Sequence, residues 1–162
     1  MNTDISYCAF SGHRSLPPGA VPRLWELLLR NIGEQADSGR VGFLCGGALG
    51  FDTLAAEAVI RVRARRPELR LVLALPCPDQ HRRWKEEDRR RFEAIRLAAD
   101  EVICVSPEYR PGCMQKRNRF MVDHSGLLLC YLTQEKGGTA YTVGYALRSG
   151  IPVVNLAVDP AQ

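Results

Sequence analysis

Short apolar runs alternate with longer amphipathic segments along the chain. The runs are mostly apolar at successive positions and rich in Val, Ile, Leu and Cys; they cover residues 5–10, 41–45, 69–76, 101–105, 126–132 and 152–157. Continuous apolar runs of this length are typical of strands that are covered on both faces of a parallel sheet. The pattern therefore predicts about six strands in a mainly parallel sheet.

The segments between the runs carry apolar residues at helical spacing. In residues 20–36, Leu24, Leu28 and Ile32 lie on one side of a helix whose first turn would contain Pro22. The same periodicity predicts helices at 52–65, 86–99, 114–123 and 139–149. Alternating strands and helices predict an α/β fold, a Rossmann-like doubly wound sheet with helices on both faces, in a single domain over residues 1–162.

Composition and charge narrow the class of protein. Of the 162 residues, 46% are hydrophobic and 25% charged, which argues against wholesale disorder. The net charge of +4 is small for a nucleic-acid coat, so nucleic acid is not an expected partner. No apolar run reaches the ~18 residues of a membrane span, and the first ten residues do not resemble a signal peptide. We therefore expect a cytoplasmic protein without a membrane partner.

The cysteines do not indicate a metal or disulfide site. None of the six forms a Cys-x-x-Cys pair. Four of them, Cys8, Cys45, Cys104 and Cys130, fall inside apolar runs, as buried reduced cysteines do. Neither a metal nor a cofactor is expected.

Candidate chemistry lies where the predicted strands end, because doubly wound sheets bind ligands beyond the carboxyl ends of their strands. The first strand is followed by Ser11, Gly12, His13 and Arg14. Small residues let the backbone approach a ligand, and the two basic side chains supply donors suited to phosphate. The alternative is an ordinary turn with solvated side chains.

A glycine-rich turn follows the second predicted strand and leads directly into a helix. Its residues are Gly46, Gly47, Ala48, Gly50, Phe51 and Asp52. The backbone N–H groups of such a turn, together with the helix N-terminus, form a cradle for an anion. No Gly-Lys-Ser/Thr follows, which argues against a P-loop kinase or ATPase. Asp52 is either a ligand contact or a helix cap.

The third predicted strand ends at a break in the chain. Pro76 begins the break, and Gln80 and Trp84 follow four residues apart, on one face if a helix has begun there. A tryptophan beside an amide suits stacking on and hydrogen bonding to a base. Alternatively, Trp84 is a packed lid residue.

Residues 81–91 resemble a basic patch but mix acids with the cations. Glu86–Arg90 and Glu87–Arg91 are spaced as i, i+4 pairs. Such pairs are typical of a solvated helix face, whereas nucleic-acid sites usually carry unmixed cations.

Two later helix starts complete the candidate site. Arg117 and Asn118, near the start of the fourth helix, suit a phosphate or a sugar. The fifth helix begins at a second glycine pair with nearby hydroxyls, in Gly137, Gly138, Thr139 and Thr142. Two glycine-to-helix junctions in one domain predict a phosphorylated small molecule, most economically a nucleotide.

These segments together resemble the SLOG superfamily, and most closely its YpsA/YoqJ-like branch. The resemblance rests on residues 11–14 and 46–52, Gln80 with Trp84, residues 117–123 and residues 137–139, and so covers nearly the whole chain. It implies a Rossmann-like fold that binds nucleotides or nucleotide derivatives. It also implies a homodimer or a higher homo-oligomer.

One group of SLOG enzymes, the LOG-type phosphoribohydrolases, cleaves the N-glycosidic bond of nucleoside 5′-monophosphates. Their helix motif Met-x-x-Arg-Lys-x-x-Met is matched in spacing by Met114, Arg117 and Met121, with Asn118 in place of Lys. Their second motif, Pro-Gly-Gly-x-Gly-Thr-x-Glu-Glu, is not matched at its glutamates, which fall at Val143 and Gly144.

The missing glutamates matter because a carboxylate stabilises the oxocarbenium-like transition state or activates water. For catalysis by this chain, Arg117, Asp52 and Glu57 are the candidate residues. We therefore place a nucleotide-binding protein, or a sensor of a nucleotide-derived ligand, ahead of an N-glycosidase. A third hypothesis is single-stranded DNA binding in the manner of DprA, a member of the same superfamily.

Overall fold

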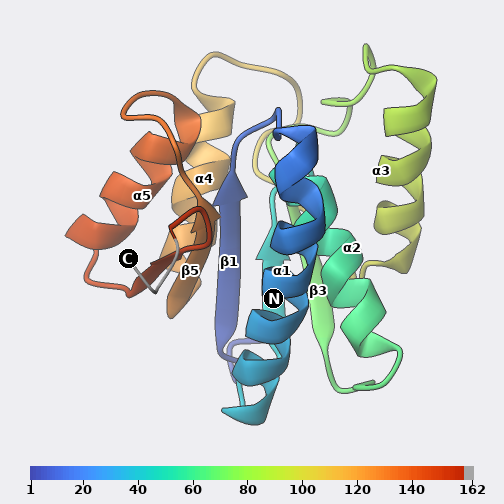
Figure 1. Cartoon of the computed structure of the whole chain (residues 1–162). Coiled ribbons are helices and arrows are strands. Elements are labelled where there is room, and N and C mark those ends of the chain that lie inside the picture. The colour runs from blue at the N-terminus through green and yellow to red at the C-terminus, as the bar shows by residue number, and fades with distance from the viewer. Residues whose placement is uncertain (159–162) are drawn as a thin grey trace.

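Six strands and five α-helices alternate along residues 1–158, the part of the chain that the computed structural model describes (Figure 1). In chain order they are β1 (Tyr7–Gly12), α1 (Val21–Asp37), β2 (Gly42–Cys45), α2 (Phe51–Arg63), β3 (Arg70–Leu75), α3 (Glu86–Ala98), β4 (Glu101–Cys104), α4 (Cys113–Asp123), β5 (Leu127–Tyr131), α5 (Gly138–Arg148) and β6 (Val153–Asn155). A short 3-10 helix, Pro18–Ala20, precedes α1. None of the helices in the described residues combines the length and the apolar character needed to cross a bilayer.

The strands form one parallel sheet in the order β4-β3-β2-β1-β5-β6. Successive strands are added on one side of β1 as far as β4, and β5 then pairs with the other side of β1. The order of the strands therefore reverses between β1 and β5, which is where doubly wound folds bind their ligands. The predicted α/β, Rossmann-like fold with about six parallel strands is confirmed.

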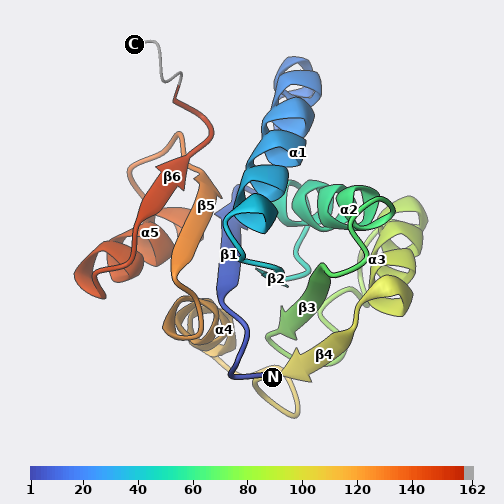
Figure 2. The ribbon, with the colours of Figure 1, turned by 90° about the horizontal axis from the view of Figure 1, so that it is seen from below.

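Helices cover both faces of the sheet, as Figure 2 shows: α1, α2 and α3 lie on one side and α4 on the other, with α5 beside it. Side chains alternate along β1 between the two layers. Cys8 and Phe10 pack with α1 and α2, whereas Tyr7 and Ala9 pack with the α4 and α5 side. Both faces of the central strands are buried, which explains why their sequences are apolar at successive positions.

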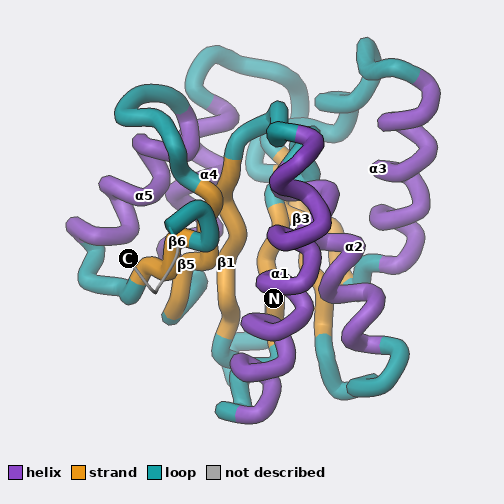
Figure 3. Tube along the Cα trace, viewed as in Figure 1, coloured by secondary structure: helices purple, strands orange, loops and turns teal. Residues whose placement is uncertain are grey.

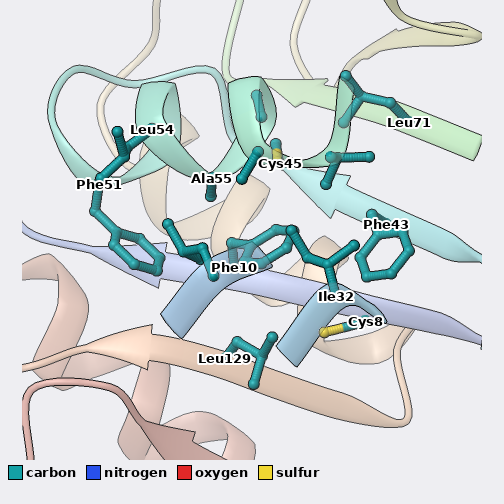
Figure 4. Close-up of a cluster of buried hydrophobic side chains, with 14 of the residues drawn as sticks. Cys8, Phe10, Ile32, Phe43, Cys45, Phe51, Leu54, Ala55, Leu71 and Leu129 are labelled. Atoms are coloured by element: carbon teal, nitrogen blue, oxygen red, sulfur yellow. The ribbon is translucent and has the colours of Figure 1, made fainter. Parts of the chain in front are cut away.

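Aromatic side chains fill the larger of the two cores (Figure 4). Phe10, Phe43 and Phe51 have no exposed surface, and the rings of Phe10 and Phe43 stack with centroids 5.9 Å apart. Burying each such side chain contributes roughly 1.5–3 kcal/mol. Phe51 is the first residue of α2, so the same packing that stabilises the core also fixes where α2 begins.

The edge strand β4 corrects one expectation. Burial alternates along this edge strand, so one of its two faces is exposed to solvent, and Cys104 lies on that face and is exposed rather than buried. Conversely, Cys77 and Cys113 lie outside the apolar runs and are buried beside the loops at the carboxyl edge of the sheet. An apolar run therefore predicts cysteine burial well in central strands and poorly at an edge.

The loops that follow the carboxyl ends of the strands gather at one edge of the sheet (Figure 3, top). A very close contact occurs there between Gly12, the last residue of β1, and the ring of Phe51. A Cβ atom on Gly12 would overlap that ring. This contact brings the end of β1 against the first turn of α2.

We expect Gly12→Ala to lower the free energy of unfolding by about 1–3 kcal/mol, because the added methyl group overpacks the core against Phe51. Gly33→Ala in α1 is the matched control. In the described residues nothing lies within 4 Å of a Cβ on Gly33, so better helix propensity should raise stability by about 0.5–1 kcal/mol. Urea unfolding measures both changes, and equal effects of the two substitutions would contradict the role given to Gly12.

Candidate functional site

A cavity of about 530 Å³ opens at the carboxyl edge of the sheet, beside the point where strand order reverses. Its size is typical of a small-molecule site. The cavity is lined by the carboxyl end of β1, by residues after β1, β2, β3 and β5, and by residues of α4 and of the first turns of α2 and α5.

The cavity brings together most of the residues singled out in the sequence. Those that line it are Ser11, Gly12, His13, Arg14, Ala48, Asp52, Gln80, Trp84, Arg117, Asn118, Gly137, Gly138 and Thr139. The remaining ligand-binding candidates do not line it; they are Gly46, Gly47, Gly50, Phe51, Pro76 and Thr142.

The glycine-rich turn before α2 is filled by the protein's own charged side chains. Asp52 accepts a hydrogen bond from the Ala48 N–H, 3.3 Å from its Oδ2, and Arg117 donates from Nη1 to the Gly46 carbonyl. A Cβ on Gly46 would lie 2.7 Å from Arg117 Nη1 and 2.8 Å from Asp52 Oδ2. Gly46 therefore leaves the space in which these two opposite charges approach each other.

Burial dominates the electrostatics of this pair. It raises the pKa of Asp52 to about 6, although the Arg117 charge and the Ala48 hydrogen bond both act in the opposite direction. Burial also lowers the pKa of Arg117, against the attraction of Asp52. The cavity thus contains a carboxyl group that exchanges its proton close to neutral pH and an arginine that faces it.

The loop after β1 docks onto the start of α2. The Phe51 N–H donates to the His13 carbonyl at 3.1 Å, and a Cβ on Gly50 would overlap the backbone of His13 and Arg14. The Thr133 N–H donates to His13 Nε2 at 2.9 Å. A neutral His13 therefore carries its proton on Nδ1. These bonds hold the ends of β1, β2 and β5 together around the cavity.

Gln80 and Trp84 reach the cavity from a turn, since α3 begins only at Glu86. Gln80 Nε2 donates to the carbonyl of Gly47 at 3.0 Å, so its amide N–H groups brace the glycine turn. Trp84 lines the cavity and also packs edge-on against Phe92, with ring centroids 5.7 Å apart. Its position is compatible with both roles considered for it, a stacking surface and a packed lid.

The N-terminus of α5 forms the opposite wall. Gly137, with a φ of 109°, precedes the helix, and over residues 1–158 no side chain caps it. Thr139 is buried and lines the cavity, whereas the Thr142 hydroxyl donates to the Gly138 carbonyl at 2.8 Å. In the described residues no capping side chain accepts a hydrogen bond from the first N–H groups of α5. These N–H groups, at the edge of the cavity, are therefore available to an anion.

Glu57 is the one catalytic candidate that lies elsewhere. It forms an ion pair with Arg91 and lines a separate surface depression between α2 and α3. The same pairing corrects the expected Glu87–Arg91 pair, because Arg91 turns toward α2 instead of along its own helix. Glu86 and Arg90 do form their i, i+4 ion pair, at 2.8 Å.

Several lining residues were not among the sequence candidates. They are Phe10, Met114, Gln115, Met121, Gln134, Lys136 and Tyr141. Met114 and Met121 belong to the LOG-like helix motif, and Gln115 and Lys136 adjoin the motifs, so position in or beside a motif could have identified these four. Gln134, in the loop after β5, and Tyr141, in the first turn of α5, carry no motif. Among the described residues, no cluster of three His, Cys, Asp or Glu side chains could hold a metal ion.

Comparison with known families agrees with this geometry. The family model YpsA, described as the YspA SLOG family, matches residues 20–149. The chain belongs to this SLOG family. A UPF0398 protein YpsA from Bacillus subtilis (strain 168) is 30% identical over 76% of this chain and 72% of its own length. The SPbeta prophage-derived protein YoqJ from the same strain is 29% identical over 66% of this chain and 70% of its own length.

Solved structures with 14–20% identity share the fold of this SLOG protein. DNA processing protein A from Helicobacter pylori, described with a single-stranded DNA binding mode, has a TM-score of 0.66 over 93% of this chain. The molybdenum cofactor binding protein from Rippkaea orientalis has a TM-score of 0.61 over 96% of this chain and 78% of its own.

DprA from Streptococcus pneumoniae has a TM-score of 0.68 over 93% of this chain. The chain spans 65% of the Helicobacter protein and 50% of the Streptococcus one. The fold is shared with a protein described as binding single-stranded DNA. The expectation, drawn from the small net charge, that nucleic acid is not a partner therefore has no support from these neighbours.

We expect Asp52→Asn to stabilise the protein by roughly 1–3 kcal/mol at pH 7.5. The folded-state pKa of about 6 lies above the unfolded value, so the stability linked to protonated Asp52 is present at low pH and is lost as the pH rises through 6. The stabilisation by Asn should therefore shrink toward pH 4. Urea unfolding of both proteins between pH 4 and 7.5 tests this, and a gap that does not change with pH would contradict it.

Proposed function

We propose that this SLOG protein binds a nucleotide or a nucleotide derivative in the cavity at the carboxyl edge of its sheet. The observation that carries the proposal is the α5 N-terminus. It opens onto the cavity with two glycines, and its first turn contains no acidic residue in the described chain. A helix start of this kind attracts phosphate through its free N–H groups and its dipole.

The other walls suit the rest of a nucleotide. Arg14 and Lys136 add positive charge to the lining, and Trp84 offers an aromatic face. Asn118 adds an amide to the lining, and its Oδ1 accepts a hydrogen bond from Arg117 Nε at 2.8 Å. Charge, aromatic surface and amide groups in one cavity match the phosphate, base and sugar of a nucleotide. Such a protein can act as a sensor if the bound ligand alters a surface that a partner reads.

We expect Gly138→Asp to weaken the binding of phosphorylated ligands by about tenfold or more, because a carboxylate would occupy the phosphate position at the helix N-terminus. In the described residues nothing lies within 4 Å of a Cβ on Gly138, so the fold should tolerate the substitution. Gly138→Asn has nearly the same size without the charge and is the matched control.

The measurement is calorimetric titration with nucleoside monophosphates, nucleotide sugars, ADP-ribose and a single-stranded oligonucleotide. The proposal requires at least one mononucleotide-sized ligand to bind, and requires Asp to weaken it much more than Asn. Absence of binding across the small-molecule panel would refute the proposal. Binding of the oligonucleotide alone would favour the DprA-like alternative.

A second function, hydrolysis of the N-glycosidic bond of a nucleoside 5′-monophosphate, is favoured by one observation. Asp52 places a carboxyl group in the same cavity as Arg117, although the glutamate pair of the LOG-type phosphoribohydrolases is replaced in this chain by Val143 and Gly144. A carboxylate there is suited to activate water or to stabilise the sugar cation. Release of free base from AMP, GMP or CMP that is lost in both Asp52→Asn and Arg117→Ala would establish it.

A further inference from the structure

The two glycine-rich junctions at the cavity differ in charge although their sequences are alike. The first turn of α5 has no acidic residue among those described, whereas the first turn of α2 contains Asp52. Asp52 is only 6% exposed, and this small exposed part faces the cavity. The α2 junction therefore presents a carboxyl group at the place where a phosphate would otherwise bind.

Two backbone donors at the α2 junction already have partners within the protein. The Ala48 N–H donates to Asp52 and the Phe51 N–H donates to the His13 carbonyl. A phosphate at this junction would thus meet a carboxylate. Repulsion between the two anions is strong in a site that is largely withdrawn from water.

Arg117 only partly compensates the Asp52 charge. It donates through Nη1 to the Gly46 carbonyl and through Nε to Asn118 Oδ1. In the described residues the Asp52 carboxylate accepts a single protein hydrogen bond, although an ionised carboxylate accepts several. A buried carboxylate with spare acceptor capacity is stabilised by hydrogen-bond donors on a ligand.

We propose that the cavity binds its ligand in one orientation, with the phosphate at the N-terminus of α5 and the vicinal 2′- and 3′-hydroxyls of a ribose on Asp52. This inference rests on the proposed nucleotide-binding function and deepens it. Two neighbouring hydroxyls donate to the two oxygens of one carboxylate, as acidic residues of dinucleotide-binding folds do toward ribose. The cavity then selects ribonucleoside 5′-phosphates over deoxy sugars and over sugars that carry phosphate at the 2′ or 3′ position.

The pH dependence of binding distinguishes a diol from a phosphate at Asp52. A diol stabilises the ionised carboxylate, so its contribution disappears as the pH falls through about 6, where Asp52 takes up a proton. A phosphate at the same place would instead bind better as Asp52 loses its charge.

Other groups near this pair also enter the pH profile. They are Cys45 on β2, Cys77 in the loop after β3, Arg117 and Cys113 on α4, and His13 and Arg14 after β1. The effects of these groups and of the ligand phosphate cancel when wild type is compared with Asp52→Asn at each pH.

The experiment is a cycle of two proteins and two ligand sets, measured by calorimetry from pH 5 to 8. The proteins are wild type and Asp52→Asn, and the ligands are the ribonucleoside 5′-monophosphates and their 2′,3′-dideoxy counterparts. At pH 7.5 either loss of the diol or Asp52→Asn should weaken binding about 10- to 100-fold, and together they should weaken it little further. The advantage of wild type over Asn should decline as the pH falls below 6.

Each alternative outcome is decisive. Monophosphate binding that responds to Gly138→Asp but not to removal of the diol or to Asp52→Asn would overturn the orientation while leaving the proposed function intact. Tighter binding by Asp52→Asn at pH 7.5 would place the phosphate at α2 and also overturn it. Binding restricted to nucleotides without a free diol would have the same consequence. Absence of any nucleotide binding would refute both proposals.

Discussion

The contact between Gly12 and the ring of Phe51 is the constraint on which the site depends. Phe51 has no exposed surface and lies between Phe10 on β1 and Tyr131 at the end of β5, with ring centroids 6.3 Å from each. Only a residue without a Cβ fits at position 12 while Phe51 keeps this place. One buried ring thus joins the ends of β1 and β5 to the first turn of α2, and Asp52 follows it directly in the chain.

Because α2 is fixed in this way, the cavity has one wall that carries a carboxyl group and an opposite wall that does not. Asp52 faces the cavity from α2 with Arg117 nearby on α4, while α5 presents an uncharged, glycine-rich first turn from the other side. Free N–H groups at a helix start attract an anion, and a buried carboxylate repels one. A ligand that bears phosphate at one end and hydroxyl donors at the other satisfies both walls at once.

Apolar patterning was sufficient to predict the fold, because central parallel strands and the helices that cover them leave strong and different periodicities. It was insufficient at the edge, where Cys104 sits in an apolar run and is nevertheless exposed. At the site, glycine-rich junctions identified which loops meet and singled out Asp52, but not that its carboxyl group is buried beside the Ala48 N–H or that Glu57 turns away to Arg91. Those outcomes depend on side-chain packing across elements far apart in sequence.

The most direct test of this account is a crystal structure of the protein with a bound ribonucleoside 5′-monophosphate. The account predicts phosphate density at the backbone N–H groups that begin α5, near Gly138 and Thr139. Phosphate density in the turn formed by residues 46–50, or a nucleotide bound outside the cavity, would contradict it.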